Sequence, residues 1–312
     1  MPRAALESRR MLYLYVAAGA TFGTIGARGL TVPLYAHQLG ASRFAVGALY
    51  AAATIAAAAL SLPSGILVDR FGARKLIGAS ILITAASLLA TSATTTVAPL
   101  FLWQVLGGIS LGIMQSAAFS AVAESVPRSK LGRAMGWLTL AMQAGFFLGP
   151  SLAGLALSWI DIRADIALTA AAMALAVPAA LVTSNTTQRA PSGIGLKEPL
   201  LALSRQRAFI QITLGLVGVT LVWGTVTAFL PVFGKEALGL PSSQVGYLLA
   251  LQAIVNGASR IPAGRIVDAA RERWKIVIGG GIVWALAATL LGHTTGFLVP
   301  AVLLIIGTPF MA

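Results

Sequence analysis

Few side chains could do chemistry inside the long apolar stretches of this sequence, and most of them are amides. Arg28 is the one charged residue well inside such a stretch, where a charge costs about 2.5–3.5 kcal/mol on insertion scales. Gln104 and Gln115 are 11 residues apart, close to three helical turns, and therefore share a helix face. Gln252 and Asn256, four residues apart, also share one. These groups suit either the lining of a polar pathway or hydrogen bonds between helices.

The sequence shows no constellation typical of catalysis or metal binding. It contains no cysteine, and its two histidines, His37 and His293, are too far apart to form a metal cluster. No acidic residue lies near the middle of an apolar run: Asp161 and Asp165 flank one polar connection and Glu236 lies in another. A phosphate-binding Gly-x-x-x-x-Gly-Lys-Ser/Thr loop is also absent, so ATP drive is not indicated. We therefore expect neither an enzyme nor a cofactor.

The composition indicates a membrane protein. Hydrophobic residues make up 57% of the chain and charged residues 10%, whereas soluble domains average about 45–50% and about 25%. The net charge of +13 does not point to nucleic acid, because the basic residues fall between apolar runs and not along one polar face. The lipid bilayer is the expected surrounding, and no nucleic-acid partner is expected.

Apolar runs of about 20 residues predict the architecture, because such a helix crosses a hydrocarbon core roughly 30 Å thick. The pattern predicts an all-α polytopic membrane protein. Its ten expected helices cover residues 11–36, 45–67, 76–95, 98–122, 134–157, 163–183, 208–231, 243–266, 275–292 and 297–312.

Basic residues alternate between the two sides that these helices define. Of the 22 Lys and Arg residues, 18 collect on the side of the N-terminus and three on the other side, namely Arg43, Arg163 and Lys235. Arg28 is the remaining one. Because Lys and Arg near helix ends stay cytoplasmic, we expect a multi-pass plasma-membrane protein with a cytoplasmic N-terminus.

The segment Gly65–Lys75 reads Gly-Ile-Leu-Val-Asp-Arg-Phe-Gly-Ala-Arg-Lys and follows a long apolar run. We expect it to form a loop at the membrane edge. It resembles the Gly-x-x-x-Asp-Arg-x-Gly-x-Arg-Arg/Lys signature between the second and third helices of the major facilitator superfamily. The alternative is a generic basic loop. The resemblance implies a fold of two six-helix halves related by a pseudo-repeat, about ten of whose helices lie in this chain.

The same resemblance assigns this segment to a conformational switch. The switch residues in the first half are Gly65, Asp69, Arg70, Gly72, Arg74 and Glu124. By resemblance, Glu124 pairs with Arg70 or Arg74 and helps to hold the halves together while the transport site faces outward. Such a latch biases a conformational equilibrium and does not touch the substrate.

The second part of the chain repeats the first. Four residues recur 199 positions later: Pro63, Gly65, Asp69 and Arg74 return as Pro262, Gly264, Asp268 and Arg273. Parallel repeats of this kind are found in transporters. We expect a first half at 1–183, a cytoplasmic linker at 184–207 and an incomplete second half at 208–312. Two helices of a six-helix second half would then be missing, either because the chain is a fragment or because it is a truncated product that needs a partner.

The fifth expected helix carries a glycine–proline pattern. It consists of Gly136, Gly145, Gly149, Pro150 and Gly154, and it resembles the antiporter signature of drug and metabolite exporters in the superfamily. Glycines four residues apart let two helices approach closely, and a proline bends its helix. The pattern therefore predicts a pivot or seal between the halves. A plain small-residue packing face is the alternative.

One position departs from proton-coupled members of the superfamily. They often carry an arginine four residues before a glycine of the fourth helix, and here that position is Gln104, before Gly108. Arg28 remains as a buried cation, unless its side chain extends to the outer interface. The candidate substrate-cavity residues are Arg28, Gln104, Gln115, Gln143, Gln252 and Asn256.

Together these patterns predict a secondary active transporter that works by alternating access, most simply an exporter of a small molecule by proton antiport. Its expected partners are the small-molecule substrate and protons, and we expect a monomer. The alternatives are an importer or symporter of a small metabolite, for which Arg28 suits an anion, and a uniporter. A non-transporting membrane receptor is the remote alternative.

Overall fold

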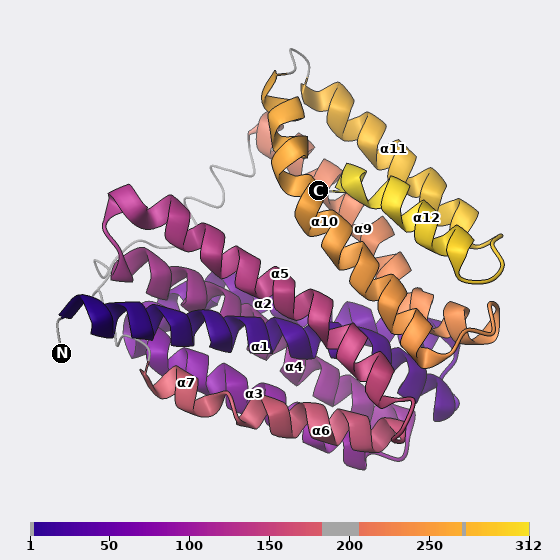
Figure 1. The fold of residues 1–312 in the computed structure, drawn as a ribbon, viewed down its shortest axis with the longest axis horizontal. Helices are drawn as coiled ribbons and strands as arrows, with labels where there is room; N and C mark the ends of the chain where they lie inside the picture. The colour runs from indigo at the N-terminus through magenta and orange to yellow at the C-terminus, as the bar shows by residue number, and fades with distance from the viewer. Residues whose placement is uncertain (1–2, 183–205, 270–272, 312) are drawn as a thin grey trace.

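The computed structural model describes residues 3–182, 206–269 and 273–311, and all of its regular structure in these ranges is helical. The helices form two groups (Figure 1). The N-terminal group contains α1 (Arg3–Gln38), α2 (Arg43–Phe71), α3 (Ala73–Ala93), α4 (Val97–Ser125), α5 (Leu131–Ala156), α6 (Ile162–Ala174) and α7 (Val177–Val182), with the short 3-10 helix η1 (Arg128–Lys130) before α5. The C-terminal group contains α9 (Arg207–Glu236), α10 (Ser242–Ala269), α11 (Arg273–Leu291), α12 (Leu298–Gly307) and the 3-10 helix η2 (Thr308–Met311).

The predicted helical architecture is confirmed. Each expected range overlaps a helix; the range 163–183 overlaps α6 and α7, and the range 297–312 overlaps α12 and η2. Five segments in the described part of the chain are long and apolar enough to cross a membrane: Arg43–Ser61, Ala73–Ala93, Val97–Ser125, Arg128–Ala156 and Ile162–Ala180. Ile278–Leu291 and Leu298–Phe310 are shorter apolar helices.

The repeat seen in the sequence is also a repeat of helix positions. α2 begins at Arg43 and α10 begins 199 residues later at Ser242. Pro63 lies inside α2 and Pro262 lies inside α10, at the same offset. Equivalent residues thus occupy equivalent places in the two groups.

The sixth expected helix, over 163–183, corresponds to the apolar span Ile162–Ala180 but is interrupted within it. α6 ends at Ala174 and α7 begins at Val177. Pro178 explains the break, because it has no N–H to donate to the Ala174 carbonyl and its ring would clash with that group. Proline is tolerated in the first turn of a helix, which is where α7 places it.

The expected loop over Gly65–Lys75 is wrong for most of its length. α2 continues to Phe71 and α3 starts at Ala73, so Gly72 alone joins the two helices. Gly72 has φ +84° and its N–H donates to the Val68 carbonyl at 2.8 Å. A side chain would be strained at this φ, so glycine allows the chain to reverse at a single residue.

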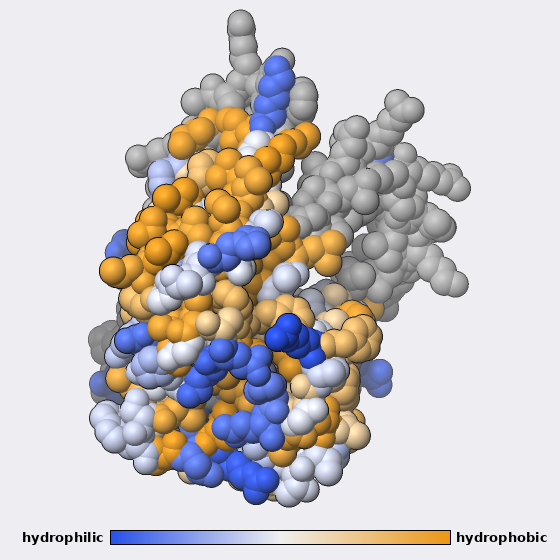
Figure 2. Space-filling model, turned by 90° about the vertical axis from the view of Figure 1, so that its right-hand side faces the viewer, coloured by the Kyte–Doolittle hydropathy of each residue, from blue (hydrophilic) through white to orange (hydrophobic). Residues whose placement is uncertain are grey.

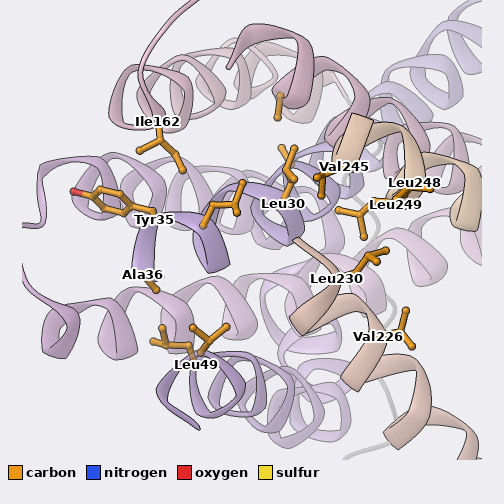
Figure 3. Packing of buried hydrophobic residues seen from close by; sticks show 14 of the residues in the cluster. Leu30, Tyr35, Ala36, Leu49, Ile162, Val226, Leu230, Val245, Leu248 and Leu249 are labelled. Atoms are coloured by element: carbon orange, nitrogen blue, oxygen red, sulfur yellow. The ribbon is translucent and has the colours of Figure 1, made fainter. Parts of the chain in front are cut away.

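Apolar packing joins the two groups at one end of the molecule. We call it the His37 end, where α1 and α9 finish and α10 begins; the Gly72 end is the opposite one. One buried cluster combines Leu30, Tyr35 and Leu49 of the N-terminal group with Leu230 and Leu248 of the C-terminal group (Figure 3). A second buried cluster, toward the Gly72 end, contains residues of the N-terminal group alone. The groups diverge away from the His37 end (Figure 1).

Candidate functional site

The Arg28 side chain extends from α1, and its guanidinium is buried against α3 and α4. The residue is 9% exposed. Nη1 donates to Ser87 Oγ at 3.2 Å, and Nη2 donates to the Trp103 carbonyl at 3.2 Å and to Gln104 Oε1. All three acceptors are neutral, and neither ion pair in the described part of the chain includes Arg28. The N-terminal group therefore holds a buried positive charge by hydrogen bonds, and the side chain does not extend to an interface.

Two features of the neighbouring helices shape this arginine site. The Ser87 hydroxyl donates to the Thr84 carbonyl at 2.9 Å, so its oxygen lone pairs remain for Arg28. On α4, Gly107 leaves the space for the guanidinium: a Cβ atom there would lie 2.0 Å from Arg28 Nη1. A residue with a side chain at position 107 is thus incompatible with this position of Arg28.

Gln104 and Gln115 have different surroundings although they share a helix. Gln104 is 6% exposed and accepts the hydrogen bond from Arg28, whereas Gln115 is exposed. A cation therefore lies beside Gln104, and α1 supplies it. The two amides do not form one continuous lining.

The other candidate amides lie where α5 meets α10. Gln143 Nε2 is 3.5 Å from the point that a Cβ atom of Gly257 would occupy. Next to Gly257 in α10, Asn256 is buried, and one turn earlier Gln252 is 4% exposed with no hydrogen-bond partner for its Nε2. An unpaired buried amide donor is costly, so this Gln252 N–H is suited to a polar group of a bound molecule.

The glycines of α5 fit closely against α1. A Cβ atom at Gly145 would lie 1.9 Å from the Gly19 carbonyl oxygen, and one at Gly149 would lie 2.0 Å from the Gly23 carbonyl oxygen. The two backbones are therefore in contact, as the spacing predicts. Gly136 differs, because a Cβ atom there would meet nothing within 4 Å.

The same helix continues into a contact with the C-terminal group at the His37 end. A Cβ atom at Gly154 would lie 2.8 Å from the Ser242 carbonyl oxygen, and one at Gly246 would lie 2.4 Å from the Pro150 carbonyl oxygen. α5 therefore touches α1 with one set of glycines and α10 with Pro150 and Gly154. It forms a close backbone contact between the two groups.

At the Gly72 end, the described residues show no pairing of Glu124 with Arg70 or Arg74, the contact expected for the outward-facing state. Asp69 and Arg70 are exposed in the last turn of α2, and Arg70 Cζ lies 5.4 Å from the centroid of the Phe71 ring. The buried Oε2 of Glu124 has no hydrogen-bond partner, and no ion pair of the described residues includes Arg70 or Arg74.

The repeat of the switch lies in α10 and α11. Gly264 and Asp268 belong to α10, and Arg273 is the first residue of α11. Their side-chain surroundings, and residues 270–272 between the helices, lie outside the described residues.

Ionic contacts across the groups occur instead at the His37 end. His37 Nε2, at the end of α1, is paired with Glu236 Oε1, at the end of α9. Arg43 Nη2, the first residue of α2, lies 4.0 Å from Glu236 Oε2. Figure 2 looks onto this end and shows hydrophilic residues gathered over its lower part, below an apolar surface. Sequence patterns did not identify Glu236 as functional, since the contact joins residues 199 positions apart.

A cavity of about 450 Å³ opens beside these contacts, between the two groups. Its lining includes His37, Asp161, Arg163, Lys235 and Ser242. Residues of both groups therefore line the cavity, and most of its charged residues are basic.

Asp165 is a buried acid at the His37 end, although the sequence patterns placed it beside a polar connection. It lies in the first turn of α6, is 2% exposed, and its Oδ2 has no hydrogen-bond partner. The side chain of Asp161 caps the helix by accepting from the Ala164 N–H at 3.0 Å. The capping by Asp161, together with the apolar residues Ile162 and Ile166 close to Asp165, was the available signal that Asp165 is buried.

Comparisons with known proteins agree on one family. The family model described as Major Facilitator Superfamily matches residues 14–312. The chain is similar to Multidrug resistance protein 1 of Bacillus subtilis, at 24% identity over 238 residues, which are 75% of this chain and 61% of that protein. The chain thus matches less than two thirds of this relative's length.

Two solved structures are similar in fold. A mutant of the nucleoside transporter NupG has a TM-score of 0.79 at 16% identity, covering 96% of this chain and 80% of the other. A bacterial homolog of the human lysosomal transporter Spinster, inward-facing and unoccupied, has a TM-score of 0.77 at 15% identity, covering 98% and 74%. With the family model spanning nearly the whole sequence, the chain belongs to the Major Facilitator Superfamily and is an integral membrane protein.

Proposed function

We propose that the protein is a secondary transporter that moves a small molecule by alternating access. The observation that carries this proposal is the difference between the two ends of the molecule. At the His37 end, the groups meet through apolar core, glycine contacts and the Glu236 pairs. At the other end they diverge (Figure 1). Two helix groups that meet at one end and diverge at the other have the arrangement of one of the two states that alternating access requires.

The proposed orientation places the His37 end outside and the Gly72 end in the cytoplasm of a plasma membrane. Its support is the 18 basic residues on the side of the Gly72 end, against three on the other. In this proposal, the protein works as a monomer whose two halves, residues 1–183 and 208–312, move against each other. Residues 184–207 connect the halves on the cytoplasmic side. The structure then corresponds to an inward-open state.

Efflux by proton antiport is the proposed direction. The α5 pattern resembles that of exporters, and its glycines pack against both groups, as a pivot requires. The similarity to a protein named for multidrug resistance supports the same direction. The proposed substrates are small amphipathic molecules.

Uptake of a small anion is the second candidate, and Arg28 favours it. Its guanidinium is buried with three neutral hydrogen-bond acceptors and without a carboxylate partner among the described residues. A buried unneutralised charge attracts an opposite charge strongly, because the surrounding dielectric is low. An anionic substrate could supply that charge.

Proteoliposomes with an acidic interior test the proposed function. If the protein is an antiporter, these proteoliposomes should take up amphipathic test compounds several-fold faster than protein-free liposomes, through the protein molecules whose Gly72 end faces the outside solution. An ionophore that collapses the proton gradient should remove the difference. Liposomes with Gly149→Val protein are the matched control for passive uptake. If the protein instead accumulates a small organic carboxylate, and Arg28→Gln removes that accumulation, anion uptake replaces efflux.

A further inference from the structure

Glu236 is the meeting point of the ionic contacts between the two groups. It is held by His37 and approached by Arg43, and both ion pairs of the described residues converge on it. His37 and Arg43 belong to the N-terminal group and Glu236 to the C-terminal group. Any movement that opens the His37 end must therefore separate Glu236 from these two partners.

One of these partners, His37, is a histidine. Histidine is the side chain that ordinarily gains or loses its proton between about pH 5 and pH 8. A protonated His37 forms an ion pair with the Glu236 carboxylate, whereas a neutral imidazole offers at most a hydrogen bond. The closed His37 end is therefore more stable when His37 is protonated. Arg43 contributes a constant attraction, because a guanidinium stays charged.

Other charged groups around His37 do not cancel this effect. Arg163 and Lys235 line the same cavity and oppose protonation of His37, whereas Asp161 on α6 favours it. These side chains are exposed, so water and salt screen their influence. Arg163 is also engaged elsewhere, with Cζ 5.8 Å from the centroid of the Tyr35 ring. The direct contact with Glu236 decides the sign.

We propose that His37 and Glu236 form a proton-binding latch that holds the outer end of the transporter closed when the external pH falls. This inference rests on the proposed alternating access and adds the group through which external protons act on it. In an exporter, acid outside then favours the return from the outward-open to the inward-open state. The latch regulates this step and does not itself carry the proton across, because His37 remains at the outer surface.

Distances between spin labels test the latch without any substrate. The chain has no cysteine, so labels can be placed at Ser158→Cys, between α5 and α6, and Thr295→Cys, between α11 and α12. Both positions are exposed, and they belong to different groups. Between about pH 8 and about pH 5.5, the ratio of short to long distances should rise roughly two- to fivefold, the range for a partly exposed ion pair. A second pair at Ser158 and Phe44, both in the N-terminal group, should show no change.

Four variants test whether the pH response arises at His37. His37→Gln should remove the pH response, and His37→Lys should favour the short distance at both pH values. Arg43→Gln should lower the short-distance population at both pH values and keep the response. Asp165→Asn, which removes a buried acid at this end, should also keep it. A pH response that persists in His37→Gln, or disappears in Asp165→Asn, would overturn the latch. The readout needs no transport, so failure of the proposed function and failure of the latch remain distinguishable.

Discussion

Gly149→Val should abolish transport and reduce the yield of folded protein. The valine Cβ would lie 2.0 Å from the Gly23 carbonyl oxygen, which belongs to the backbone of α1 and cannot rotate away. Separating the two helices to admit the side chain costs about 1–3 kcal/mol or more, and it changes the contact about which α5 pivots. The measurement is transport activity per mole of monodisperse protein, together with thermal stability in detergent.

Gly136→Val is the matched control, because it makes the same change in the same helix. A Cβ atom at position 136 meets nothing within 4 Å, so the variant should keep transport and stability close to those of the unchanged protein. Equal loss in the two variants would show that valine harms α5 as a helix, and the close α1–α5 contact would then not be the cause.

Gly107→Ala should lower transport about tenfold or more, a loss of at least about 1.4 kcal/mol, by displacing Arg28. The added methyl group would occupy the place of the guanidinium, whose Nη1 lies 2.0 Å from that Cβ position. Arg28→Gln should cause a loss of similar size, because it removes the charge and its hydrogen bonds to Ser87 and to the Trp103 carbonyl. Initial transport rates at saturating substrate provide the measurement.

The two changes should not add. Once Arg28 has been replaced, the clash at Gly107 is gone, so the double variant should behave like Arg28→Gln alone. Gly132→Ala, at a position with no neighbour within 4 Å, controls for an extra methyl group on a helix. Additive losses in the double variant would mean that Gly107 acts through some contact other than Arg28.

Helix positions and the repeat could be predicted from the sequence because they depend on local patterns. Apolar runs of membrane-spanning length indicated the helices, and the recurrence of Pro63 and Asp69 indicated the two equivalent halves. The spacing of Gly145 and Gly149 likewise predicted a close helix contact, which the structure places between α5 and α1. The same pattern also included Gly136, where a Cβ atom would meet nothing within 4 Å, since a pattern shows which residues are small and not where a neighbouring helix passes.

Contacts between distant segments could not be predicted in this way. The meeting of Arg28 with Gln104 depends on how α1 crosses α4, and the pairing of His37 with Glu236 depends on how the two groups meet. Local conformations were missed for a different reason. Around Pro178, a continuous apolar run suggested one helix, and around Gly72, a polar run suggested one loop. Backbone restrictions at these two residues decided where the helices end.

The central claim is that transport requires the His37 end to separate and close again. Cysteines at His37 and Glu236 in this cysteine-free chain can be joined by a bifunctional thiol reagent of a length that matches their contact. The joined protein should remain folded and bind its substrate from the Gly72 end, but it should not transport. The two single-cysteine variants, treated with the same reagent, should transport at the rate of the untreated double variant. Undiminished transport by fully cross-linked protein would contradict alternating access through this end.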